Sequence, residues 1–167
     1  MYIRQTATAG RSPVVPVRWW VVAVLGVAFW LLLSADGIAQ KSGTLVIRND
    51  RGGSVAERVA RIDRLRRSGI KVEIRGDYCL SACTMYLGVP GACVAPDTVF
   101  GFHGPSSPVY GVALRPREFE YWSHLMARYY PAALRKWFLE VARNRLVGFE
   151  RKSGRELIRL GLPRCAS

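Results

Sequence analysis

The sequence predicts an α/β domain in which helices flank a mostly parallel sheet. Short, β-branched apolar runs at 44–50, 70–76 and 98–104 are typical of strands. A helical pattern at 54–67 and a short apolar helix ending at Leu87 separate these runs. Strands that alternate with helices are joined by right-handed crossovers and form parallel sheets. The 167 residues suffice for one domain with one core.

The pair Gly52-Gly53 joins the first strand to the first helix, because paired glycines permit a sharp turn. We expect this helix to run from about Ser54 to Arg67, with Gly69 at its C-cap. Its arginines at 58, 61, 64 and 67 follow helical spacing. They are predicted to form a solvent-exposed face opposite Val55, Val59, Ile62 and Leu65.

Three more helices are predicted after the third strand. Two cover 115–130 and 131–145, each with a proline near its first turn. The last is short and begins with a capping box formed by Ser153 and Glu156. The aromatic residues of the two longer helices are expected in the core or in an oligomer contact: Phe119, Tyr121, Trp122, Tyr129, Tyr130, Trp137 and Phe138.

The chain is predicted to divide into a leader at 1–39 and a domain at 40–167. An uncharged apolar run from Trp19 to Ala35 follows three arginines and precedes small residues, which is the layout of an export signal cleaved after Ala39. The run is only slightly shorter than a bilayer span, so an N-terminal membrane anchor is the alternative.

The domain is strongly basic. Removing 1–39 takes away three arginines and one aspartate, so the formal net charge falls by two, from +13 to +11. This excess favours anionic membranes or acidic partners over long range. The chain has no basic motif interleaved with aromatic residues, so specific nucleic-acid binding is not expected.

All four cysteines, Cys79, Cys83, Cys93 and Cys165, follow the leader. An even number of cysteines in an exported chain predicts disulfides, and four cysteines allow three pairings. A zinc site is not expected, because Cys79 and Cys83 have Cys-x3-Cys spacing and no second Cys or His pair completes a tetrahedral set.

Three chemically useful features follow strands of the predicted sheet: Gly52-Gly53, Ser81 and His103. The carboxyl ends of parallel strands meet at one edge, where ligands bind. Acyl transfer uses a serine that is activated by a histidine, together with backbone N–H groups that bind the oxyanion. The alternatives are an N-cap role for Ser81 and a structural histidine bonded to a backbone carbonyl at position 103. His124 lies within a predicted helix and is expected to be structural.

The stretch from Thr44 to Pro105 resembles the active-site half of the ClpP/crotonase superfamily. The likeness rests on "NDRGGSVAERVARIDRL", on "DYCLSACTMYLG" and on "CVAPDTVFGFHGP", in that order. It is most similar to exported bacterial ClpP-like proteins, whose serine lies in a Cys-x-Ser-Ala-Cys element. The resemblance implies a ClpP/crotonase-like fold of ββα repeats, Ser81 as nucleophile and His103 as general base. It also implies oxyanion-hole N–H groups at Gly53 and Ala82, and no metal or cofactor.

The chain departs from this family in three places. Asp50-Arg51 stands where the family has Ser-Pro or Thr-Pro before its glycines. The family's opening strand–helix unit has no counterpart between Gln40 and Gly43, so the sheet is expected to be smaller or completed by another chain. The third catalytic acid is not evident, and Glu150, just before the last helix, is the candidate.

The cysteines flanking Ser81 suggest a pairing. Cys79 and Cys83 lie two residues on either side of Ser81, so a disulfide between them would rigidify the turn that presents the serine. Cys93 and Cys165 would then tie the last helix to the sheet. Redox-active thiols are the alternative, but the Cys-x-x-Cys spacing of disulfide oxidoreductases is missing.

We therefore predict a serine-type peptide or ester hydrolase, in the periplasm or anchored to the bacterial inner membrane facing it. Its partners would be a peptide or protein substrate and further copies of itself. A catalytically silent ClpP-like binding module is the alternative. A serine–lysine peptidase would need Lys41, Lys71, Lys136 or Lys152 in the cleft, and no motif places one there. A coenzyme A-binding relative does not use a serine–histidine pair.

Overall fold

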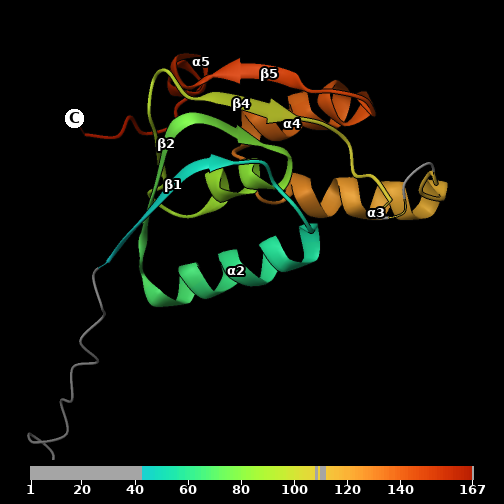
Figure 1. The fold of residues 1–167 in the computed structure, drawn as a ribbon, viewed down its shortest axis with the longest axis horizontal. Helices are drawn as coiled ribbons and strands as arrows, with labels where there is room; N and C mark the ends of the chain where they lie inside the picture. Colours follow the sequence, from blue (N-terminus) through green and yellow to red (C-terminus); the bar gives the residue numbers. More distant parts are fainter. Residues whose placement is uncertain (1–42, 108, 110–111, 167) are drawn as a thin grey trace, which may run out of the picture. The chain divides into compact units, whose positions relative to one another are not determined.

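The computed structural model describes residues 43–107, 109 and 112–166, which form a mixed α/β domain. Figure 1 shows its mostly parallel sheet with helices beside it. The strand order is β1-β2-β4-β5, and β3 pairs with β2. The β1–β2, β2–β3 and β2–β4 pairs are parallel, whereas β5 is antiparallel to β4. The strands are β1 (Thr44–Asp50), β2 (Lys71–Leu80), β3 (Cys93–Val94), β4 (Val99–Phe102) and β5 (Glu150–Ser153).

The first helix, α2 (Val55–Ser68), begins and ends as the sequence predicts. The side chain of Ser54 accepts a hydrogen bond from the Glu57 amide at the N-cap, and Gly69 closes the helix with φ of 65°. In Figure 1, α2 lies against the face of β1 and β2. Its residues Ile62 and Leu65 are buried there, which matches the predicted apolar face.

The later helices are α3 (Pro116–Ala127), α4 (Ala132–Glu140) and α5 (Gly154–Arg159), with a 3₁₀ turn, η2 (Ala142–Asn144), after α4. The predicted capping box before α5 is present: Glu156 accepts from the Ser153 amide, and the Ser153 hydroxyl accepts from the Glu156 amide. The predicted helix at 131–145 is instead two elements, because α4 ends at Glu140 and η2 follows it.

Three further elements differ from the sequence prediction. Strand β2 runs on to Leu80 instead of ending at Gly76, because β4 pairs with its second half from Tyr78 onward. The helix after it, η1 (Ser81–Gly88), is a 3₁₀ helix. Strand β5 was not predicted, because its sequence, "ERKS", has neither apolar alternation nor β-branched residues. The strand forms because β4 pairs with it.

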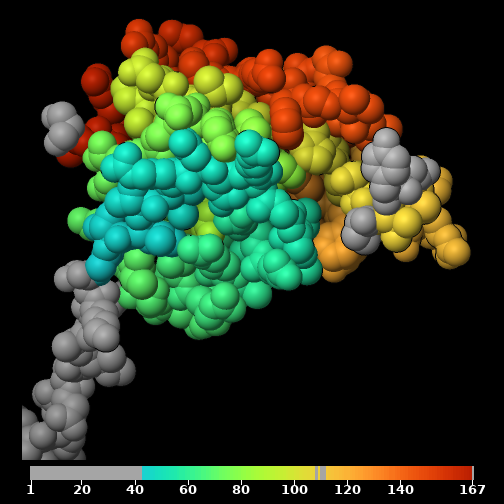
Figure 2. Space-filling view, viewed as in Figure 1, coloured from blue at the N-terminus to red at the C-terminus, as the bar shows by residue number. Residues whose placement is uncertain are grey.

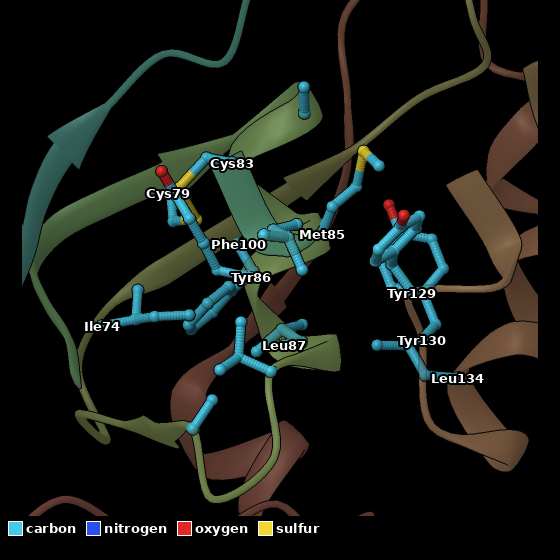
Figure 3. Close-up of a cluster of buried hydrophobic side chains, with 14 of the residues drawn as sticks. Ile74, Cys79, Cys83, Met85, Tyr86, Leu87, Phe100, Tyr129, Tyr130 and Leu134 are labelled. Carbon is cyan, nitrogen blue, oxygen red and sulfur yellow. A yellow bond between two sulfur atoms is a disulfide. The ribbon is translucent and has the colours of Figure 1, made fainter. Parts of the chain in front are cut away.

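The core lies between the sheet and η1, nearly all of whose side chains are buried. Figure 3 shows Tyr86 and Leu87 of η1 beside Ile74 and Phe100 of the sheet, with Tyr129, Tyr130 and Leu134 on the other side of the cluster. A buried hydrogen bond of 2.8 Å joins the hydroxyls of Thr84 and Tyr130. The core thus ties η1 to the segment that links α3 and α4.

Both predicted disulfides are present. Cys79–Cys83 has a Cα–Cα distance of 5.4 Å, and Cys93–Cys165 has one of 4.9 Å. The second joins the end of the described chain to β3, where the Cys165 amide also donates to the Val94 carbonyl. Two disulfides are typical of an oxidising compartment outside the cytoplasm.

Within residues 43–107, 109 and 112–166, no helix has the length and apolarity needed to cross a bilayer. The predicted signal or anchor at 1–39 lies outside the described residues.

Candidate active site

Ser81 follows β2 directly and adopts an unusual backbone conformation. Its φ is +54°, a left-handed value that non-glycine residues rarely adopt. It is the first residue of η1, and the N-cap position belongs to Leu80. The Ser81 hydroxyl therefore does not cap the helix. The Thr84 hydroxyl donates to the Ser81 carbonyl at 2.7 Å and holds the turn in this shape.

The sheet brings His103 to Ser81. Leu80 and Gly101 are partners in the parallel β2–β4 register, so the chain beyond each strand leaves the sheet at the same edge. His103 follows the last residue of β4, and its Nε2 lies 2.7 Å from Ser81 Oγ. A hydrogen bond of this length joins a hydroxyl to the group that could take its proton.

Burial lowers the pKa of His103, and a hydrogen bond with the Gly104 backbone opposes this effect only in part. The imidazole is therefore neutral at neutral pH, the form that can accept a proton. The Phe149 ring packs edge-on against it, with ring centres 5.3 Å apart. Among the described residues, no carboxylate is hydrogen-bonded to His103. Glu150, the candidate acid, binds Arg145 at 2.8 Å instead.

The glycine pair lies against the serine turn. A Cβ on Gly52 would come within 2.5 Å of Ser81 Cβ and 3.0 Å of the Ala82 nitrogen, so only glycine fits. A Cβ on Gly53 would meet nothing within 4 Å. Ala82 is in the first turn of η1, where an N–H group has no partner within its own helix. Both predicted oxyanion-hole residues thus lie around Ser81.

Arg58 does not belong to the exposed face of α2, contrary to the sequence prediction. It is only 8% exposed and forms an ion pair with Asp50 at 2.9 Å. Its Nη2 also donates to the Gly52 carbonyl at 2.9 Å, and its guanidinium lies 4.5 Å from the centre of the Tyr86 ring. The helical pattern could not reveal this role, because Asp50 and Tyr86 approach Arg58 only in the folded chain. Arg61, Arg64 and Arg67 are exposed as predicted.

A pocket of about 430 Å³ adjoins Ser81 and His103. In Figure 2, the cyan-to-green β1–α2 segment borders the yellow and orange segments that follow His103, and the pocket takes residues from both. Gly53 and Ser54 line one side. The apolar lining was not predicted from the sequence, because it combines Val55, Leu114, Trp122 and Met126 from distant segments.

The other candidate residues lie elsewhere. His124 is exposed and pairs with Glu120 at 3.5 Å. Lys71, Lys136 and Lys152 are absent from the pocket lining, and Lys41 lies outside the described residues. Glu73, Cys93 and Cys165 bring ligand atoms within 4.8 Å of one another, but both sulfurs belong to a disulfide.

The comparisons give no family for this chain: no protein-family model and no curated protein matches it.

Proposed function

We propose that the protein is a serine-type hydrolase of peptides or esters that acts through Ser81 and His103. The observation that carries this proposal is the 2.7 Å contact between His103 Nε2 and Ser81 Oγ. The positive φ of Ser81 supports it, because strained backbone at a polar residue is concentrated at functional sites. The lowered pKa of His103 supports it too, since a general base must be unprotonated.

The proposed reaction proceeds through an acyl-enzyme. Ser81 Oγ attacks the substrate carbonyl carbon while His103 Nε2 takes the hydroxyl proton. The negative charge that develops on the carbonyl oxygen is stabilised by the N–H groups of Gly53 and Ala82. The C–N or C–O bond then breaks, and His103 gives its proton to the leaving amine or alcohol. Water, deprotonated by His103, attacks the ester on Ser81 and releases the acid.

The pocket favours substrates with an apolar group near the scissile carbonyl. Val55, Leu114, Trp122 and Met126 line the pocket beside Ser81 with apolar side chains. A backbone hydrogen bond of Gly104 partly offsets the effect of burial on the pKa of His103, and no carboxylate among the described residues is hydrogen-bonded to His103. A backbone partner does not carry the negative charge that stabilises an imidazolium, so we expect slow turnover compared with a complete triad.

We further propose a ClpP/crotonase-like fold, with a site of action in the periplasm or at the periplasmic face of the inner membrane. The Gly-Gly turn, the serine and the histidine occur in the order expected for that superfamily. The two disulfides agree with an oxidising compartment. Peptide or protein substrates and a homo-oligomeric state complete the proposal.

One observation favours a second function, a catalytically silent binding module. In the described part of the chain no carboxylate is hydrogen-bonded to His103, and the aromatic ring of Phe149 packs against it. An apolar pocket beside an inactive pair could still hold an extended peptide.

Labelling with a fluorophosphonate distinguishes the hydrolase from the binding module. The full chain would be exported by a bacterial host, purified from the envelope in mild detergent, and treated with the probe, and mass spectrometry would locate the adduct. We expect labelling at Ser81 that Ser81→Ala and His103→Ala both abolish. His124→Ala is the matched control and should label like the wild type, because His124 is exposed and is not among the residues that line the pocket. A folded protein that is not labelled contradicts the hydrolase and favours the binding module.

A further inference from the structure

We propose that Arg58 and Asp50 are positioning residues that set the direction of the Gly53 N–H, and thereby the oxyanion hole. The expected effect on kcat rests on the proposed hydrolase function, whereas the expected effect on the structure of the glycine turn does not.

The two side chains hold both polar groups of Gly52. Asp50 Oδ1 accepts a hydrogen bond of 2.7 Å from the Gly52 amide. Arg58 Nη2 donates one of 2.9 Å to the Gly52 carbonyl. The same Nη2 lies 2.9 Å from Asp50 Oδ2 and 3.2 Å from Oδ1, so the ion pair and the glycine form one connected network.

The network matters because a Gly-Gly peptide is free to rotate. Gly52 and Gly53 have φ values of 104° and 116°, in a region where glycine has no steric penalty. The Gly52 carbonyl and the Gly53 N–H belong to one planar trans peptide, so they point in opposite directions. Arg58 holds the carbonyl on the α2 side. The Gly53 N–H is thereby directed away from Arg58, and Gly53 lines the pocket that contains Ser81.

The burial of Arg58 indicates a specific role. A guanidinium that is only 8% exposed has lost most of its hydration, which is unfavourable without good partners. Arg58 recovers this loss through the Asp50 carboxylate, the Gly52 carbonyl and the face of the Tyr86 ring. Tyr86 belongs to η1, the element that begins with Ser81. The network therefore fixes the glycine turn relative to the nucleophile from two sides.

The test compares Arg58→Met with Arg64→Met. Both arginines are on α2, but Arg64 is exposed and does not take part in this network. Amide hydrogen exchange of Gly52 and Gly53, measured by NMR on the full chain, reports the turn without any need for activity. We expect faster exchange in Arg58→Met at the Gly52 amide, which is hydrogen-bonded to Asp50, and wild-type rates in Arg64→Met. Unchanged exchange in Arg58→Met would overturn the proposal.

Kinetics provide a second readout. A misdirected oxyanion donor weakens binding of the transition state more than that of the substrate. We expect Arg58→Met to lower kcat by about 10- to 100-fold, below the loss caused by removing a donor outright, with KM changed less than about threefold. Its affinity for a peptidyl boronate, which mimics the tetrahedral intermediate, should fall by the same factor as kcat. An effect confined to KM would contradict the proposal.

A milder variant protects the test against misfolding. Asp50→Asn keeps the acceptor for the Gly52 amide but removes the charge that holds Arg58, and we expect a smaller change of the same kind in both readouts. If Arg58→Met does not fold, wild-type exchange and kinetics in Asp50→Asn overturn the proposal. A wild-type protein that is not labelled at Ser81 contradicts the hydrolase function alone, because the exchange experiment still decides the role of Arg58.

Discussion

Gly52 and Ser81 are so close that a side chain on Gly52 cannot be accommodated: its Cβ would lie 2.5 Å from Ser81 Cβ. The two residues come from different loops, one after β1 and one after β2. Their contact places the glycine turn and the serine turn as one unit at the edge of the sheet. Five predictions concern this arrangement and the groups that support it.

Replacing Gly52 with alanine should reduce both stability and activity. The substitution forces alanine into positive φ, at a cost of about 1–3 kcal/mol, and the collision with Ser81 adds about 1–3 kcal/mol. Gly53→Ala is the control, because it has the backbone cost without a collision. Urea denaturation should give the lower unfolding free energy for Gly52→Ala. Equal unfolding free energies would mean that the Ser81 turn moves aside readily.

The proposed hydrolysis should require neutral His103. Because burial lowers the pKa of His103 below its ordinary 6.5, kcat/KM should rise with pH through a midpoint below 6.5 and then stay level to about pH 8. An initial-rate profile with an ester substrate measures this midpoint. A midpoint well above 6.5 would contradict a desolvated base.

The lowered pKa of His103 should also make the unfolding free energy depend on pH. The unfolded chain binds a proton at position 103 at a higher pH than the folded chain does. The His103 contribution to the unfolding free energy is therefore complete above the unfolded pKa of about 6.5, and it falls as the pH is lowered toward the folded pKa. Denaturation at several pH values should show a steeper acid-side decrease for the wild type than for His103→Asn. Parallel curves would rule out a lowered pKa.

The two disulfides should have different roles. By the loop-entropy model, a bridge spanning 72 residues stabilises by about 4 kcal/mol and one spanning 4 residues by about 2 kcal/mol. Removing Cys93 and Cys165 should therefore lower Tm more. Replacing Cys79 and Cys83 with alanine should lower fluorophosphonate labelling more, because that bridge encloses Ser81. Retained labelling in a folded Cys79→Ala, Cys83→Ala variant would assign that bridge to stability alone.

Substituting Thr84 should destabilise the fold more than the small size of its side chain suggests. Its hydroxyl donates to the Ser81 carbonyl at 2.7 Å and is hydrogen-bonded to the Tyr130 hydroxyl at 2.8 Å. Thr84→Val removes both bonds and leaves the buried Tyr130 hydroxyl without this partner, at a cost of about 1–3 kcal/mol. Tyr130→Phe keeps the bond to Ser81 and should cost less. Denaturant midpoints of the two variants measure the difference.

Elements with local signals can be predicted from the residue types. Strand β1 and helix α2, with its caps at Ser54 and Gly69, follow from short-range patterns. The capping box of Ser153 and Glu156 does as well. Such features depend on hydrogen bonds between residues a few positions apart, so the residue types alone reveal them. The order of Gly52-Gly53, Ser81 and His103 also made their meeting predictable, because parallel strands bring their carboxyl ends to one edge.

Other features depend on neighbours far away in the sequence and form only in the folded chain. Strand β5 forms because β4 is available to pair with it, although "ERKS" has no strand pattern. Arg58 is buried because Asp50 and Tyr86 surround it, whereas its helical position predicted exposure. Glu150 binds Arg145, and Phe149 rather than an acid lies against His103. In each case the free energy comes from contacts between segments far apart in the chain, and a pattern within one segment does not encode them.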